Sequence, residues 1–218
     1  MSSINSYDVN NGRDERVAIF IDGSNLYHSL EENCKRFDLD FGAFSKRLCN
    51  GRPLFRTYYY NVLRDPDRNP QAHRDQQKFL NVLYNTPYLD VRLGSSKMRG
   101  DVAVEKGIDV MVATDILRFG WDNLYDVAIL VSGDGDFHYA LQSVKDMGKH
   151  VEVAAFQTNL ATELTQVADD SMIFTPDYFK DLWTNRRGSA PAANRGAEPR
   201  RRFWRRLRPD DANPAPAD

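Results

Sequence analysis

The stretch VAILVSGDGDF (residues 127–137) places five apolar residues directly before a loop of Ser, Gly and Asp. An unbroken apolar run of this length is typical of a strand buried on both faces, as in a parallel sheet. The segment Val17–Ile21 has the same form, because its five apolar residues are followed by Asp22 and Gly23. Glycines beside these acids let a backbone or a phosphate approach closely. We therefore expect two buried strands that each end in an acidic loop.

Strand and helix patterns alternate through the rest of the chain. They predict further strands at 55–62, 88–93, 151–155 and 172–174, and helices at about 24–34, 71–84, 108–119, 137–147 and 160–167, with a last helical turn at 178–183. Residues 94–106 are predicted to form a polar loop with a small hairpin at 99–101. Such alternation predicts a parallel sheet with helices on both faces. Ligands in these folds bind beyond the carboxyl ends of the strands, where the strand order reverses.

The length of 218 residues and the hydrophobic content of 41% suit one α/β domain with tails. We place the domain at 16–183, between a polar N-terminus at 1–15 and an Arg-rich tail at 184–218, and expect both ends to be disordered. Residues 186–218 hold nine Arg and four acids, a net charge of +5, so the total of −2 leaves −7 on residues 1–185. An acidic domain is a poor partner for a polyanion unless cations occupy it.

Other sequence features argue against a secreted or membrane-spanning protein. The N-terminus lacks the apolar segment of a signal peptide. The longest apolar runs, of about five or six residues, are too short to cross a bilayer. Cys34 and Cys49 are too few for a disulfide framework, so we expect thiols. These features predict a soluble cytoplasmic protein with no membrane span.

Four aspartates stand where predicted strands end or predicted helices begin: Asp22, Asp109, Asp134 and Asp136. If the strands at 17–21 and 127–131 are neighbours, Asp22 and Asp134 lie side by side, and their repulsion raises their pKa values. A divalent cation removes this penalty, and an all-oxygen ligand set fits Mg²⁺ or Mn²⁺ rather than Zn²⁺. Taken singly, Asp109 or Asp136 fits an ordinary helix N-cap, and Asp22 fits a turn residue.

Three segments together resemble the signature blocks of NYN-domain proteins of the LabA type, in the PIN-like nuclease superfamily: FIDGSN (20–25), EKGIDV (105–110) and LVSGDGDF (130–137). The resemblance covers about residues 16–183. It implies a PIN-like Rossmannoid α/β fold, a three-layer sandwich with a mainly parallel sheet, and metal-dependent cleavage of RNA. It points to Asp22, Asp109, Asp134 and Asp136 as metal ligands and catalytic residues, and to Asn25 as a catalytic residue that helps to hold the site. His138 departs from the apolar residue that is usual there.

The expected reaction is hydrolysis of RNA phosphodiester bonds with Mg²⁺ or Mn²⁺, by an endonuclease acting on single-stranded RNA that leaves a 5′-phosphate and a 3′-hydroxyl. Candidate substrate-binding residues are Ser24 and Ser132, which lie beside the acids, and Lys97, Arg99 and Lys106 of the polar loop. The three basic residues fit a solvated hairpin equally well. Asp115 lies about 120° around its helix from Asp109, which favours a supporting role over that of a ligand.

The Arg-rich tail contains Phe203 and Trp204 and resembles a nucleic-acid-binding arm. It also fits contact with an anionic membrane surface, or a solubilising role. The sequence leaves the oligomeric state open, a homodimer included.

The main alternative function is a catalytically weak or inactive NYN module that binds RNA or a partner protein. A phosphatase of the haloacid-dehalogenase type needs Asp-x-Asp on the first strand, whereas Gly23 and Ser24 follow Asp22. A Toprim-like site stays open, with Asp22 in the place of its usual Glu. Dinucleotide binding is disfavoured because no G-x-G-x-x-G follows the first strand.

Overall fold

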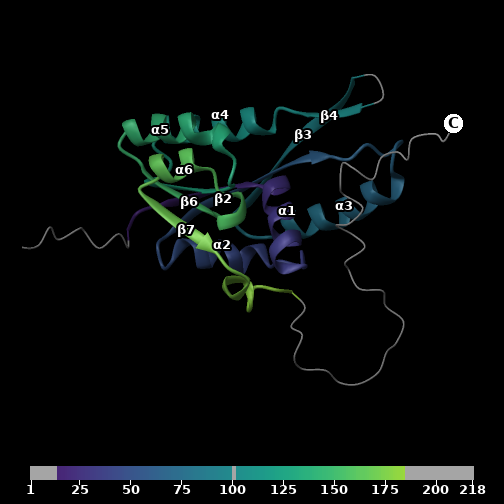
Figure 1. Cartoon of the computed structure of the whole chain (residues 1–218), viewed down its shortest axis with the longest axis horizontal. Coiled ribbons are helices and arrows are strands. Elements are labelled where there is room, and N and C mark those ends of the chain that lie inside the picture. Colours follow the sequence, from purple (N-terminus) through teal and green to yellow (C-terminus); the bar gives the residue numbers. More distant parts are fainter. Residues whose placement is uncertain (1–13, 100–101, 185–218) are drawn as a thin grey trace, which may run out of the picture.

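The computed structural model describes residues 14–99 and 102–184, and between residues 96 and 106 it describes backbone alone (Figure 1). The predicted disordered ends at 1–15 and 184–218 therefore lie outside the described residues, apart from 14–15 and 184.

In the described residues, seven strands form one sheet in the order β4-β3-β2-β1-β5-β6-β7. The strands are β1 (Val17–Asp22), β2 (Leu54–Leu63), β3 (Leu89–Arg99), β4 (Val102–Lys106), β5 (Val127–Val131), β6 (His150–Phe156) and β7 (Asp170–Phe174). Neighbouring strands are parallel except β3 and β4, which are antiparallel. The helices are α1 (Gly23–Cys34), α2 (Phe41–Cys49), α3 (Pro70–Tyr84), α4 (Ile108–Trp121), α5 (His138–Asp146) and α6 (Thr162–Val167), with 3-10 turns η1 (Gly135–Phe137), η2 (Gln157–Asn159) and η3 (Pro176–Phe179). The predicted α/β fold with a mainly parallel sheet is confirmed.

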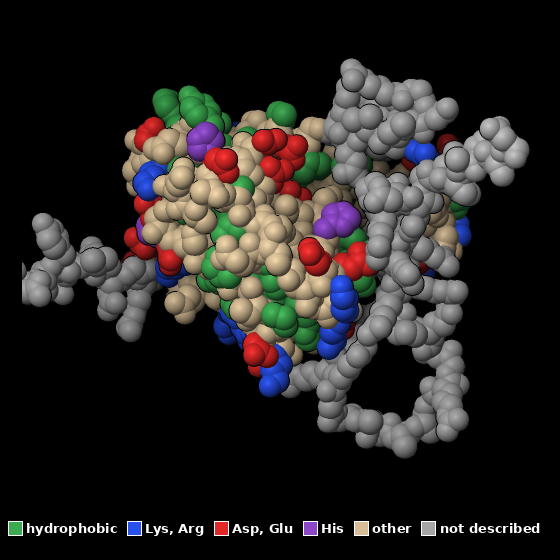
Figure 2. Space-filling view, in the orientation of Figure 1, with side chains coloured by type: hydrophobic (Ala, Val, Ile, Leu, Met, Phe, Trp, Pro, Cys, Tyr) green, Lys and Arg blue, Asp and Glu red, His purple; other side chains and the backbone are tan. Residues whose placement is uncertain are grey.

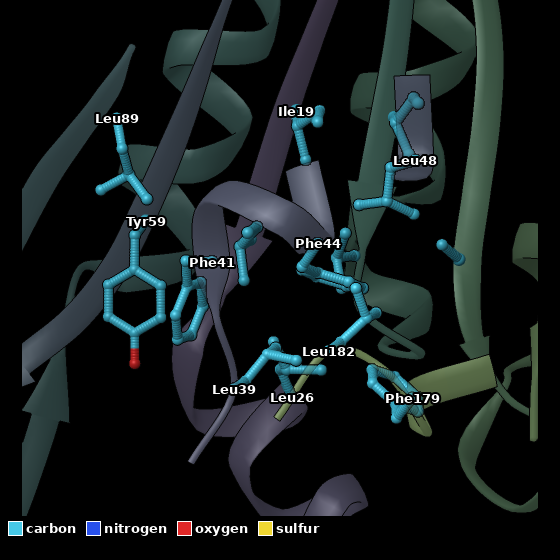
Figure 3. Packing of buried hydrophobic residues seen from close by; sticks show 14 of the residues in the cluster. Ile19, Leu26, Leu39, Phe41, Phe44, Leu48, Tyr59, Leu89, Phe179 and Leu182 are labelled. Carbon is cyan, nitrogen blue, oxygen red and sulfur yellow. The ribbon is translucent and has the colours of Figure 1, made fainter. Parts of the chain in front are cut away.

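Helices cover both faces of the sheet, which confirms the three-layer sandwich (Figure 1). Helices α1, α2 and α3 pack on one face, and α4, α5 and α6 pack on the other. Residues of β1 alternate between the two cores, with Val17, Ile19 and Ile21 in the first and Ala18 and Phe20 in the second. Figure 3 shows the first core, where Ile19 of β1 packs in one cluster with Leu26 of α1 and Phe44 of α2. The apolar run of β1 is therefore buried on both faces, as a central parallel strand requires.

The strand order reverses at β1. The chain runs from β1 through β2 to β3 on one side, and from β5 through β6 to β7 on the other. Strand β1 pairs with both β2 and β5, so that Ile21 lies beside Val131 and Asp22 lies beside Tyr60. The loops after β1 and β5 therefore leave the same edge of the sheet next to each other, where doubly wound folds bind ligands.

Two segments differ from the prediction. Helix α2 is not predicted from the sequence; it begins after Asp40, whose carboxylate accepts a hydrogen bond from the backbone N–H of Ala43, and it buries Phe44. Residues 94–106 contain a longer hairpin than the small one predicted at 99–101, because β3 continues to Arg99 and its last five residues pair with β4. Hydrogen bonds between backbone groups hold this hairpin together, and the hydropathy of the side chains does not indicate such bonds.

Helix α4 is also longer than predicted, because it continues through Gly120 to Trp121. A Cβ atom at Gly120 would lie 2.9 Å from the hydroxyl oxygen of Tyr125 and 3.1 Å from a methyl group of Val144. This glycine therefore permits close packing of the helix and does not end it.

Cys34 and Cys49 are free thiols, as the sequence predicts. Burial raises the pKa of each to about 11, so both stay protonated near neutral pH. No helix in residues 14–99 and 102–184 is long and apolar enough to cross a membrane.

Candidate functional site

Asp22 connects the ends of β1 and β5. Its side chain is buried and caps α1, because Oδ1 accepts a hydrogen bond of 3.0 Å from the backbone N–H of Asn25. The other oxygen, Oδ2, lies 3.4 Å from the hydroxyl of Ser132, which donates to it. Ser132 follows β5 directly, so one carboxylate begins a helix and also contacts the neighbouring loop.

The loop after β5 is folded around its own acidic residues. The Ser132 hydroxyl accepts a hydrogen bond of 3.2 Å from the backbone N–H of Asp134. Asp134 Oδ1 accepts another, of 3.0 Å, from the backbone N–H of Asp136, and so begins η1. Asp134 is half-buried and Asp136 is exposed. Ser132 is buried and its hydroxyl is used twice within the protein, which places this predicted substrate contact inside the loop and not on its surface.

Asn25 holds the same loop from the side of α1. Its Oδ1 accepts a hydrogen bond of 3.1 Å from the backbone N–H of Gly133. Asn159, at the end of η2, donates its side-chain amide to Asn25 Oδ1 at 3.4 Å and to the hydroxyl of Ser29. The backbone N–H of Ala161 also donates to the Gly133 carbonyl at 3.0 Å. Segments after β1, β5 and β6 are thus fastened to one another at the carboxyl edge.

Asp109 completes the acidic group. It lies in the first turn of α4 and is exposed. Partial burial raises its pKa, and the charges of Asp134 and Asp136 raise it further. Burial raises the pKa of Asp22 to about 6; its hydrogen bond from Asn25 opposes this shift, and the charges of Asp109 and Asp134 add to it. Figure 2 shows acidic side chains gathered in the region where Figure 1 places α4 and α6. All four predicted acids therefore belong to one electrostatic group.

The donor set suits a hydrated divalent cation better than a closed protein cage. Among the described residues, no three His, Cys, Asp or Glu side chains lie close enough together to hold one ion. Mg²⁺ usually keeps several waters and is bound through one or two carboxylates together with substrate phosphate. The donors here are carboxylate oxygens whose charges repel one another, and all-oxygen donors of this kind suit such an ion. The assignment of Asp22, Asp109, Asp134 and Asp136 as ligands stays a prediction.

The fold brings two residues to the site that the sequence does not indicate. Glu163 lies in the first turn of α6, and its Oε2 is 3.6 Å from where a Cβ atom of Gly135 would stand. Asn159 reaches Asn25 and Ser29 although it lies 134 and 130 residues further along the chain. Neither residue lies in a recognisable motif, so only the tertiary structure identifies them.

The remaining predicted residues lie in different places. Ser24 is half-buried, and its backbone N–H lowers the pKa of Asp22 as a minor contribution. The side chains of Lys97, Arg99 and Lys106 lie outside the described residues, so their contact with RNA stays a prediction. Asp115 accepts a hydrogen bond of 3.0 Å from Tyr60, on the flank of α4 that faces β3, and stands apart from the acidic group.

The buried charge on Asp22 is expected to destabilise the metal-free protein. The folded-state pKa of about 6 exceeds the ordinary value of 3.8, so the folded chain holds this proton more tightly than the unfolded chain does. The destabilisation is therefore absent below about pH 4, grows as the pH rises, and above about pH 6 reaches about 3 kcal/mol. In EDTA at pH 7.5, Asp22→Asn should raise the free energy of unfolding in urea by about 1 to 3 kcal/mol. At pH 4 the gain should vanish.

Asparagine is also a good N-cap, so the substitution removes the charge and keeps the helix start. Asp40→Asn is the matched control, because Asp40 caps α2 through a hydrogen bond of the same length, 3.0 Å, but is exposed. It should show no gain at either pH. If Asp22→Asn instead lowers the free energy of unfolding by the same amount at pH 4 and at pH 7.5, the buried-charge explanation is contradicted.

Comparison with known proteins gives three similarities. A family model described as the NYN domain matches residues 16–176. The low amplitude and bright protein LabA of Synechococcus elongatus is 30% identical over 169 residues, which are 72% of this chain and 82% of the relative. A crystal structure of a protein of unknown function from Vibrio parahaemolyticus has a TM-score of 0.63 at 24% identity, over 76% of this chain and 96% of that one, and shares the fold. A flap endonuclease of bacteriophage T5 covers 66% of this chain and 56% of its own at 19% identity, but its TM-score of 0.37 is too low to bear on function.

Proposed function

Since the chain belongs to the NYN domain family, within the PIN-like nuclease superfamily, we propose that it is a metal-dependent ribonuclease. In this proposal it hydrolyses phosphodiester bonds in single-stranded RNA as an endonuclease. The observation that carries the proposal is the convergence of Asp22, Asp109 and Asp134 at the reversal of strand order, where burial and mutual repulsion raise the pKa of Asp22 to about 6. Such a group is poorly suited to a purely structural role, because it destabilises the fold unless a cation is present.

The chain's own residues have distinct parts in this proposal. Asp22 and Asp134, together with the more exposed Asp109 and Asp136, would hold a hydrated Mg²⁺ or Mn²⁺. When bound, the ion supplies a water of lowered pKa and neutralises charge on the phosphate. Asn25 and Ser132 fix the loop that carries Asp134, through the contacts to Gly133 and to the Asp134 backbone. Addition of water across the P–O3′ bond leaves a 5′-phosphate and a 3′-hydroxyl.

The accessible acids also explain why RNA is a workable substrate for an acidic domain. Asp109 and Asp136 are exposed, so a phosphate and an ion can enter together from solvent. The ion offsets much of the local negative charge, which lessens the repulsion of a polyanion. The predicted contributions of the Arg-rich tail and of a homodimer stay predictions, and the tail lies outside the described residues.

The direct test is cleavage of a uniformly labelled single-stranded RNA by the full chain in EDTA, Mg²⁺ or Mn²⁺. We expect no cleavage in EDTA, cleavage in Mg²⁺ or Mn²⁺, and recovery when the metal is restored after chelation. Internal fragments that carry a 5′-phosphate would identify an endonuclease with the proposed chemistry. Mn²⁺ binding measured by calorimetry provides a readout that does not depend on turnover.

A second candidate function follows from the open arrangement of the acids. Because no three of the described side chains form a ready metal cage, the chain also fits a catalytically weak module that binds RNA or a partner protein. Binding of the labelled RNA without cleavage in any metal would establish this candidate and overturn the ribonuclease.

A further inference from the structure

Arg92 lies in the same row of the sheet as Asp22. Asp22 pairs with Tyr60 across β1 and β2, and Tyr60 pairs with Arg92 across β2 and β3. Neighbouring strands are about 4.8 Å apart, so the backbones of Asp22 and Arg92 are separated by about 10 Å. Because alternate residues of a strand share a face, Arg92 projects on the side of Tyr58 and Tyr60, the side that α4 covers.

The guanidinium of Arg92 rests against an aromatic ring, but its capacity to donate hydrogen bonds is poorly used. It lies over the ring of Tyr58, 5.7 Å from the centroid. Its Nε is 3.8 Å from Asp115 Oδ2, which is too far for a hydrogen bond. Nε is buried and has no hydrogen-bond partner among the described residues, while the side chain as a whole is 41% exposed. Arginine has five N–H donors, and buried donors in proteins almost always have a partner.

Other arginines of this chain make close contacts with carboxylates. The contacts are between Arg16 and Asp126, Arg36 and Asp38, Arg52 and Glu152, and Arg56 and Asp90, each with hydrogen bonds to the carboxylate oxygens. Arg92 differs from these because its nearest carboxylate is beyond hydrogen-bond distance. A planar guanidinium with unused donors is well suited to a phosphate, which accepts two parallel N–H bonds.

The support beneath Arg92 is rigid. Tyr58 is buried, stacks on Phe119 with ring centroids 4.8 Å apart, and stacks on Phe20 at 5.5 Å. An arginine resting on a fixed aromatic face loses little conformational freedom when it binds a ligand. The aromatic face beneath the guanidinium is therefore in place before any ligand arrives.

From these contacts we propose that Arg92 binds a phosphodiester group of the RNA, next to the phosphate held at the acidic group. This inference rests on the proposed function, because it takes single-stranded RNA as the substrate. The RNA then runs from the acidic group along the flank of α4 that faces β3. Arg92 acts there as a substrate-binding residue, which sets the register of the RNA and takes no part in bond cleavage.

The test compares Arg92→Gln with Arg56→Gln. Both changes remove one positive charge from the same face of the sheet, and the two side chains are similarly exposed, at 41% and 37%. Arg56, however, pairs with Ala18 near the start of β1 and is bonded to Asp90 at 2.9 Å. Binding of a fluorescent single-stranded RNA to the full chain is measured by anisotropy over a range of salt, with Ca²⁺ in place of Mn²⁺ so that the acidic group holds a divalent ion. Cleavage kinetics are measured in Mn²⁺, and thermal unfolding checks the fold of each variant.

We expect Arg92→Gln to raise Kd and KM by about 10-fold, to leave kcat within about twofold, and to lower the slope of log K against log salt by about 0.7 to 1. Arg92→Lys should keep the salt slope and lose part of the affinity, because lysine cannot bind phosphate in a bidentate manner. Arg56→Gln should change Kd by less than about twofold.

Equal effects of Arg92→Gln and Arg56→Gln in a chain that binds and cleaves RNA would overturn the role of Arg92 and leave the ribonuclease standing. A loss of RNA affinity specific to Arg92→Gln, in a chain that cleaves nothing in any metal, would support the contact and overturn the ribonuclease.

Discussion

Asp134→Asn is expected to lower the rate of Mn²⁺-dependent RNA cleavage by about 100- to 1,000-fold without unfolding the protein. Asp134 Oδ1 accepts the backbone N–H of Asp136, and an asparagine oxygen can accept the same bond. The loop after β5 should therefore keep its shape. The substitution removes one negative charge from the group that includes Asp22 and Asp109, so the affinity for a divalent cation falls.

The measurement pairs RNA cleavage with Mn²⁺ binding by calorimetry, and thermal unfolding checks the fold. Asp146→Asn is the matched control, since Asp146 is exposed at the far end of α5 and bonds Gln142 of the same helix. It should cleave and bind Mn²⁺ like the unmodified chain. Cleavage by Asp134→Asn at the unmodified rate, with Mn²⁺ affinity unchanged, would remove Asp134 from the site.

Gly133→Ala is expected to lower the free energy of unfolding by at least about 2 kcal/mol and to reduce cleavage by at least about 100-fold. A Cβ atom at this position would lie 1.9 Å from the carbonyl oxygen of Asn159 and 2.7 Å from its carbonyl carbon. These are backbone atoms, so no side-chain rotation relieves the clash. Gly133 is also held by hydrogen bonds on both sides, from its N–H to Asn25 and from Ala161 to its carbonyl.

The clash must separate the loop after β5 from the loop after β6, and this moves Asp134. Gly135→Ala is the control, because the nearest atoms to a Cβ there belong to side chains: the methyl group of Ala161 at 3.3 Å, a tight contact but not a clash, and the flexible carboxylate of Glu163 at 3.6 Å. Urea unfolding and the cleavage assay together measure both effects. If Gly133→Ala is as stable and as active as Gly135→Ala, the close approach of the two loops is not needed for the site.

The sequence predicts the centre of this fold well because burial on both faces leaves a direct trace in hydropathy. Strands β1 and β5 are apolar throughout and end at acidic loops, so their place and the meeting of Asp22 with the loop of Asp134 follow from the residues. Gly133 likewise stands where a close backbone approach is expected from its position beside the acid.

The parts that the sequence does not predict depend on distant contacts. Helix α2 has nine residues, a length that is marginal for an isolated helix. The packing of its Phe44 against Phe174 and Phe179, far along the chain, stabilises it. Asn159 joins the site through hydrogen bonds to Asn25 and Ser29, which no local pattern encodes. Local periodicity reports what a segment buries, and does not report which other segment it meets.

The fastening of three separate loops at the carboxyl edge has a consequence for protein synthesis. Asn25, Gly133 and Asn159 emerge from the ribosome at widely spaced times, and the loop that carries Asp134 lacks one of its supports until the last of them is available. A nascent chain that has not reached Asn159 therefore cannot hold the loop of Asp134 as the finished protein does, and the acidic group takes its final form only when synthesis of the domain is almost complete.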